Sequence, residues 1–204
     1  IATDDPARAG IALKLAEAHY RTGDYASASA VIRQAQAVAV TDADRAAALT
    51  LLGEVTSDVG DHHGAQAMLS EAIPLARASA NSLTLCRALY VLGDVHWRAG
   101  AHLEAHAALN ESLALARGSG DATRELFALG RLASVIQDQG DFGGAKALFT
   151  TMRAQAEATG NRERAMNALM NLGQIADKQK DFARGQACGH QALALAREIG
   201  AQQT

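Results

Sequence analysis

The stretch LGQIADKQKDFARGQACGHQA (residues 172–192) decides the fold, because the same arrangement occurs four more times upstream. In each copy a small residue follows a leucine, a turn begins seven residues later, and a second small residue lies five residues further on. The first small residues are Ala16, Gly53, Gly93, Ala133 and Gly173, and the turns are Gly23-Asp24, Gly60-Asp61, Gly100-Ala101, Gly140-Asp141 and Lys180-Asp181. Turns that are 37, 40, 40 and 40 residues apart predict a solenoid of stacked supersecondary units.

Each unit is predicted to be a pair of helices joined by that turn. Gly23 can adopt the left-handed conformation that closes a helix, and Asp24 can cap the next one. Asp5-Pro6 is a typical helix start. The sequence therefore predicts an all-α, right-handed α-solenoid of five helical hairpins in a single domain, with repeats at about 5–40, 44–78, 82–118, 121–159 and 161–200.

The ends and one proline depart from a uniform array. Leu193, Leu195 and Ile199 are expected on the inner stripe of the last helix, although only four residues follow that helix. We therefore expect further repeats, or a second copy, to cover this end. Ile1 is not an initiator methionine, so we expect the chain to be part of a longer protein. Pro74 lies inside a helix and is expected to bend it.

Composition excludes several kinds of partner and site. The chain has 204 residues, a net charge of −3 and a pI near 6.2, which disfavours direct nucleic-acid binding. No apolar run is long enough for a membrane span. Cys86 and Cys188 lie about two and a half repeats apart, so no disulfide is expected. These features favour a cytoplasmic protein.

The repeats resemble the tetratricopeptide-repeat family. The resemblance rests on Leu52-Gly53, Gly60, Ala65, Leu69 and Ala72, and it covers essentially the whole chain. The period resembles the longer variants in kinesin light chains, polarity-complex scaffolds and bacterial signalling regulators. Endings such as Ala114-Leu115-Ala116-Arg117 are similar to those of repeat arrays attached to bacterial transcription activators and signal-transducing ATPases.

The family resemblance implies that the first helix of each hairpin lines a concave groove. Helical spacing predicts which polar and aromatic side chains face it: Glu17, Tyr20, Arg21, Glu54, Asp58, Arg87, Tyr90, Asp94, Trp97, Arg98, Phe127, Gln137, Asp138, Asn167, Gln174, Asp177 and Lys178. Tyr90, Trp97 and Phe127, flanked by Arg87 and Arg98, are the residue types of binding hot spots. The alternative is that the aromatic rings pack between repeats and the charges form a solvated face.

No catalytic or metal-binding motif is evident in the sequence. His102 and His106 lie four residues apart, and His62 occupies the place of His102 one repeat earlier, but no third ligand accompanies them. His19 and His96 recur at equivalent places and are expected to be half-buried. We therefore expect no enzyme activity, no metal and no cofactor.

The sequence thus predicts a module that binds a protein or peptide segment in its concave groove, within a larger signalling protein. One alternative is a sensor domain for a small-molecule inducer, as the regulator resemblance implies. Another is a structural assembly module that forms a homodimer through its bare C-terminal helix.

Overall fold

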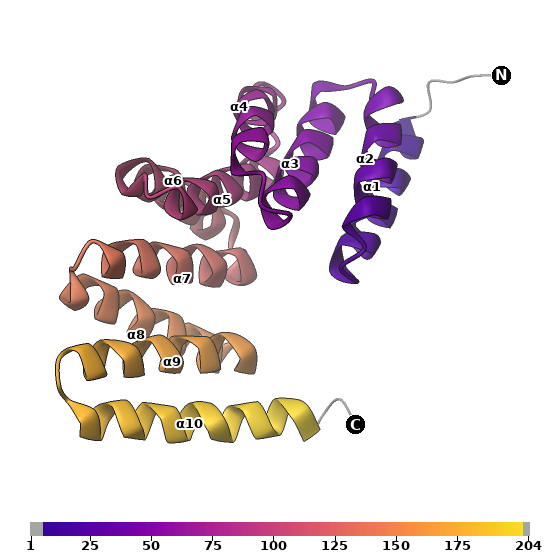
Figure 1. Cartoon of the computed structure of the whole chain (residues 1–204). Helices are drawn as coiled ribbons and strands as arrows, with labels where there is room; N and C mark the ends of the chain where they lie inside the picture. Colours follow the sequence, from indigo (N-terminus) through magenta and orange to yellow (C-terminus); the bar gives the residue numbers. More distant parts are fainter. Residues whose placement is uncertain (1–5, 202–204) are drawn as a thin grey trace. The chain divides into compact units, whose positions relative to one another are not determined.

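The computed structural model describes residues 6–201, and side chains from residue 8 to residue 200. These residues form ten helices and no strand (Figure 1). The bounds are α1 Pro6–Arg21, α2 Tyr25–Ala37, α3 Asp42–Asp58, α4 His62–Ala78, α5 Ser82–Arg98, α6 His102–Ser119, α7 Ala122–Asp138, α8 Phe142–Ala158, α9 Arg162–Lys178 and α10 Phe182–Ala201. The prediction of an all-α helical repeat is confirmed. The predicted boundary at residue 5 and the Asp5 cap lie outside the described residues.

The chain divides into two compact units, an N-terminal unit of residues 1–115 and a C-terminal unit of residues 116–204. The boundary falls within α6. The single domain and its repeat boundaries stay a prediction.

The hairpin turns have the predicted chemistry. Gly23, Gly60, Gly100 and Gly140 have positive φ angles of 77°, 94°, 75° and 87°. The Asp24, Asp61 and Asp141 carboxylates then accept hydrogen bonds from backbone N–H groups three residues later, which caps α2, α4 and α8. Lys180 adopts the same left-handed region at φ 63° without being a glycine, so the turn geometry and not the residue type is common to all repeats.

The junction between α2 and α3 differs from the prediction. The helix expected to continue to about residue 40 ends at Ala37, and the next helix begins at Asp42 rather than at Asp44. The Thr41 hydroxyl accepts a hydrogen bond from the backbone N–H of Asp44 at 3.1 Å and donates one to its carboxylate at 2.7 Å. This reciprocal contact fixes Thr41 as the N-cap, so Asp42 already lies in the first turn.

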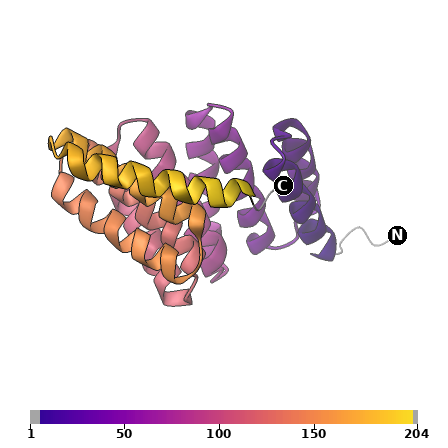
Figure 2. The same cartoon turned by 90° about the horizontal axis from the view of Figure 1, so that it is seen from below.

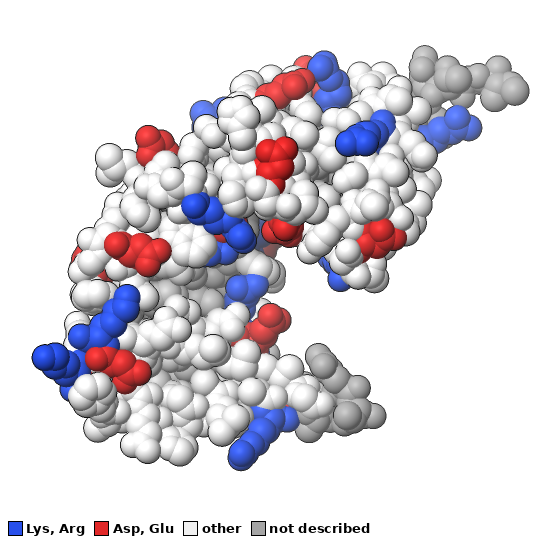
Figure 3. All heavy atoms as spheres, viewed as in Figure 1, with Lys and Arg blue, Asp and Glu red and all other residues white. Residues whose placement is uncertain are grey.

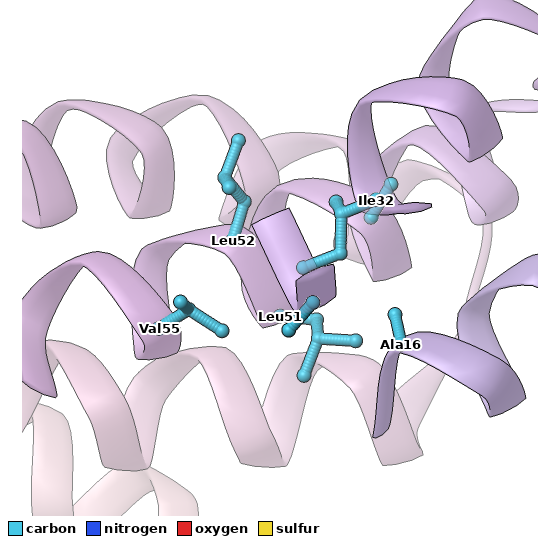
Figure 4. Close-up of a cluster of buried hydrophobic side chains, with 7 residues drawn as sticks. Ala16, Ile32, Leu51, Leu52 and Val55 are labelled. Carbon is cyan, nitrogen blue, oxygen red and sulfur yellow. The ribbon is translucent and has the colours of Figure 1, made fainter. Parts of the chain in front are cut away.

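The core of the N-terminal unit forms where the second helix of one hairpin packs on the first helix of the next. Ile32 of α2 shares a buried cluster with Ala16 of α1 and with Leu51, Leu52 and Val55 of α3 (Figure 4). Helix α4 packs in the same way on α5, and the first helices α1, α3 and α5 also contact one another in succession. The first helices therefore share one side of this unit.

The small residues of the repeat allow close helix approach, as predicted. A Cβ atom on Gly93 of α5 would lie 2.5 Å from Leu109 Cγ and 3.3 Å from the carbonyl oxygen of Ala105, both on α6. Real Cβ atoms do not approach so closely, so an alanine here would force Leu109 out of place. At Gly173 the nearest side-chain atom would be 3.4 Å away, and the equivalent Ala133 is fully buried. The need for glycine thus differs between repeats.

The C-terminal unit contains the end of α6 and helices α7 to α10, of which α7 to α10 pack in chain order. Phe149 of α8 is among its largest fully buried side chains. Helix α10 contacts α9, and within the C-terminal unit no other described helix packs on its far side (Figure 2). Leu193, expected in the core, is 50% exposed because no described helix follows α10.

Pro74 does not terminate α4, which continues from His62 to Ala78 with Pro74 exposed on its surface. Cys86 and Cys188 are both free and buried, in agreement with the prediction. Cys86 contacts Ser112 of α6, whose hydroxyl donates to the Cys86 carbonyl oxygen at 2.8 Å. No helix in the described part of the chain has the length and apolar character needed to span a membrane.

Candidate partner-binding face

The predicted groove residues lie on the first helices of the hairpins. We call the side formed by α1, α3 and α5 the first-helix face of the N-terminal unit; it carries Glu17, Tyr20, Arg21, Glu54, Asp58, Arg87, Tyr90, Asp94, Trp97 and Arg98. The first helices of the C-terminal unit, α7 and α9, carry the other seven: Phe127, Gln137, Asp138, Asn167, Gln174, Asp177 and Lys178. The predicted residues are therefore divided between two units.

Arg87 joins three first helices of the N-terminal unit. Its Nε donates a hydrogen bond to Glu54 Oε2 on α3 at 2.8 Å, and its Nη1 donates to Glu17 Oε1 on α1 at 2.5 Å. The Arg87 side chain is 28% exposed and that of Glu54 is 20% exposed. Burial works against the charged guanidinium, but Glu54 and Glu17 outweigh it and raise the pKa of Arg87 above its ordinary value. Arg87 is thus held as a cation between two carboxylates.

A second contact between hairpins links α1 and α3. The Tyr20 hydroxyl donates a hydrogen bond to Asp58 Oδ2 at 2.6 Å. Burial raises the pKa of Tyr20 well above 10, and the nearby Glu54 and Asp58 carboxylates raise it further. Because a neutral phenol is required for this hydrogen bond, Tyr20 holds the first two hairpins together only while it is protonated.

We expect the stability of the chain to fall in alkali, and the change Tyr20→Phe to reduce that fall. A tyrosine whose pKa is raised on folding stabilises fully below about pH 10, and this contribution is lost as the pH rises above that value. One such group changes the free energy of unfolding by less than about 1.4 kcal/mol per pH unit, which is the largest slope that Tyr20 can cause. The slope is measured by urea unfolding between about pH 9 and pH 11. An equal slope in both proteins would contradict this assignment to Tyr20.

Helix α5 carries the aromatic residues of this face. Tyr90 and Trp97 are half-buried, and the exposed Arg98 donates from Nε to Asp94 Oδ2 at 2.7 Å. Asp94 itself is buried, so it positions Arg98 and does not form part of the surface. The hydrogen bond to Asp94 is the largest influence that raises the pKa of Arg98. Helix α5 therefore presents two aromatic rings beside an oriented cation.

The C-terminal unit presents a different set of groups. Phe127 of α7 is half-buried, and the Arg164 guanidinium of α9 lies 3.6 Å from its ring centroid, in a cation–π contact. Lys178 Nζ lies 5.4 Å from the ring centroid of Phe142. Gln137 is buried, whereas Asn167 is half-buried. The remaining predicted residues of this unit are exposed: Asp138, Gln174, Asp177 and Lys178.

Charge and histidine positions do not single out another site. On the side drawn in Figure 3, acidic and basic residues are interspersed and separated by uncharged surface. His106 hydrogen-bonds Asn110 through Nδ1 at 2.9 Å, and His19 is half-buried 3.4 Å from Asp24. Among the described residues, no group of three or more His, Cys, Asp or Glu side chains could hold a metal ion.

Sequence reasoning missed Arg164. It was not recognised because it lies in the first turn of α9, outside the spacing used to choose the groove residues. Contacts between neighbouring first helices join residues at different separations, 33 for Glu54–Arg87 and 38 for Tyr20–Asp58. Phe127 and Arg164 are 37 positions apart, so the repeat period alone does not select this pair.

Comparison with known proteins identifies the repeat. Residues 44–118 match the model described as tetratricopeptide repeat. A comparison with curated protein sequences gave no match.

Solved structures share the fold at low identity. A Rap protein complexed with Competence and Sporulation Factor is 15% identical, with a TM-score of 0.82. The match covers 94% of this chain and 54% of the Rap chain. The Rap conjugation gene regulator of plasmid pLS20, in complex with the Phr* peptide, is 13% identical, with a TM-score of 0.75 and coverages of 93% and 53%. A putative kinesin light chain from Podosopora anserina, with nearly identical TPR-like repeats, is 17% identical, with a TM-score of 0.73 and coverages of 96% and 98%.

The chain spans about half the length of the two Rap structures and nearly all of the kinesin-light-chain repeats. The family match, the ten helices of the described residues and this structural likeness agree with one another. Residues 44–118 therefore carry the sequence pattern of the tetratricopeptide repeat, and the described residues share the helical-repeat fold of these solved structures.

Proposed function

We propose that the chain is a non-catalytic interaction module that binds a segment of a partner protein on the first-helix face of its N-terminal unit. In this proposal it serves as a regulatory part of a larger signalling protein in the cytoplasm and makes no direct contact with nucleic acid. The observation that carries the proposal is on α5, where Tyr90, Trp97 and Arg98 lie within two and a half turns and none of the three is buried. Trp, Tyr and Arg dominate the energetics of protein interfaces.

The ion pairs of this face support the same function. Arg87 is held by Glu17 and Glu54, and Arg98 is held by Asp94, so two charged groups are already oriented before a partner arrives. An oriented surface loses less conformational entropy on binding than a mobile one. The first-helix face is therefore suited to bind a short segment that folds little by itself.

Two further observations indicate the type of partner. The two Rap structures of similar fold hold a named factor and a peptide, which supports a peptide as the ligand here. Without the buried Asp94, the predicted residues of the N-terminal unit include three carboxylates, Glu17, Glu54 and Asp58, and three arginines. We therefore expect the bound segment to carry charges of both signs.

Peptides selected from a random display library on the wild-type chain are expected to bind through this face. A labelled synthetic copy of a selected peptide should bind the Tyr90→Ala/Arg98→Ala variant at least about tenfold more weakly, since each hot-spot residue typically contributes more than 1 kcal/mol. Binding is measured by fluorescence anisotropy. Trp97 is the only tryptophan of the chain, so its emission should also change when the peptide binds.

The matched control is Leu103→Ala/Asn110→Ala, which removes two exposed side chains from α6 in the same unit. This variant should bind the peptide like the wild type. Equal weakening by both double variants would contradict the proposed face. Failure to select any peptide would contradict peptide binding altogether and would favour the small-molecule sensor.

A further inference from the structure

Interfaces between consecutive hairpins pair a large residue with an alanine. Ile32 of α2 shares a buried cluster with Ala48 of α3, and Leu69 of α4 shares one with Ala88 of α5. In the C-terminal unit, α8 packs on α9, and the equivalent residues are Phe149, which is 1% exposed, and Ala168, which is fully buried. The second helix therefore supplies the large side chain and the first helix of the next hairpin supplies the small one.

At the two outer helices the sizes are exchanged. The position of Phe149 is occupied in α10 by Gly189, and a Cβ atom placed there would meet nothing within 4 Å. The position of Ala168 is occupied in α1 by Ile11, which is 67% exposed. The open space beside Gly189 on α10, which we call the notch, thus corresponds to the projecting apolar side chain of Ile11 on α1.

Apolar side chains surround both features. Phe182 and Leu193 are 67% and 50% exposed, and helical spacing places them on the same stripe of α10 as Gly189. On α1, Leu15 follows Ile11 by one turn and is half-exposed, whereas the equivalent Leu52 and Leu172 are buried. Helices α3, α5 and α9 each pack on the preceding hairpin, and no described helix precedes α1, so the α1 stripe is the same type of surface.

We propose that the chain associates head to tail, with α1 of one copy docked on α10 of another copy. Ile11 then occupies the notch at Gly189. Because the second helix of a hairpin and the next first helix run in opposite directions, Leu15 is brought toward Phe182. This α1–α10 contact between two copies, which we call the joint, reproduces the packing between consecutive hairpins with the large and small residues exchanged.

A second copy is the occupant that these faces select. A hairpin of the internal type would present an alanine opposite Gly189 and leave the notch unfilled, as Ala48, Ala88 and Ala168 show. Only α1 among the first helices presents a larger side chain at this position. Since the two faces differ, association is heterologous and does not close at a dimer.

The experiment is sedimentation velocity on the 204-residue chain from about 1 to 500 µM. For the wild type, the mass-average sedimentation coefficient should rise continuously with protein concentration. Ile11→Asp places a charge in the notch, and Gly189→Leu fills it with a side chain of the size found at Leu69. Each variant alone should associate at least about 100-fold more weakly, because each removes the centre of the joint.

A mixture of the two variants distinguishes this arrangement from others. The Ile11→Asp chain keeps an intact α10, and the Gly189→Leu chain keeps an intact α1, so an equimolar mixture should form heterodimers with the wild-type affinity and stop there. Recovery in the mixture also shows that both variants are folded.

Three outcomes would overturn the proposal. A wild type that stays monomeric at 500 µM shows that the two faces do not bind each other. An Ile11→Asp chain that still dimerises, beside a Gly189→Leu chain that does not, indicates a symmetric dimer of α10 helices. Absence of heterodimer in the mixture of two chains of native helical content excludes the α1–α10 joint.

Discussion

Phe149→Ala is expected to lower the free energy of unfolding by about 4 kcal/mol, the usual cost of replacing a fully buried phenylalanine. Phe149 is 1% exposed on α8, which packs on both α7 and α9. Removal of the ring leaves a cavity that three helices would have to move to close. The loss should be visible in urea unfolding followed by circular dichroism.

The control is Phe182→Ala in the same unit. Phe182 is largely exposed in the first turn of α10, so the same chemical change should cost less than about 1 kcal/mol. Losses of similar size at both positions would show that Phe149 does not carry the core of the C-terminal unit. Because Trp97 lies in the other unit, its fluorescence tests whether the two units unfold together.

Arg87→Met is expected to lower the free energy of unfolding by about 3 kcal/mol, since it leaves two carboxylates that are partly withdrawn from water without their cation. Glu17 and Glu54 come from different hairpins and both depend on Arg87. Trp97 lies on the same helix as Arg87, so urea unfolding is measured by its fluorescence. Replacement of both carboxylates by glutamine in the Arg87→Met chain should restore part of the loss.

Arg77→Met serves as the matched control. Arg77 also forms an ion pair, with Glu111 Oε1 at 2.7 Å, but both side chains are well exposed. Exposed pairs contribute less than about 1 kcal/mol, so this variant should be nearly as stable as the wild type. If Arg77→Met and Arg87→Met cost the same, the partial burial of Arg87 has no energetic consequence.

Much of the fold could be predicted from the sequence because turn chemistry and small residues act locally. Gly23 and Asp24 need only their own backbone geometry to close one helix and cap the next. The α2–α3 junction could not be predicted, because the choice of Thr41 as the cap depends on its hydrogen bonds with Asp44. Several polar residues can serve as a cap in such a stretch, and packing decides between them.

The candidate site was predictable as a face and not as a set of contacts. Helical spacing places Glu17, Glu54 and Arg87 on the same side of their helices, but the ion pairs join residues 33 and 70 positions apart. Their formation depends on the offset between neighbouring hairpins, which sequence periodicity does not contain. Gln137 illustrates the limit, because the same spacing chose it and the structure buries it.

The pairing of Ile32 with Ala48 and of Leu69 with Ala88 has a consequence for how such a gene can change. Since these interfaces use the same pairing of a large with a small residue, an in-register duplication or loss of one whole repeat would join surfaces that already fit. The number of repeats can therefore change during evolution without remodelling the core of the neighbouring hairpins.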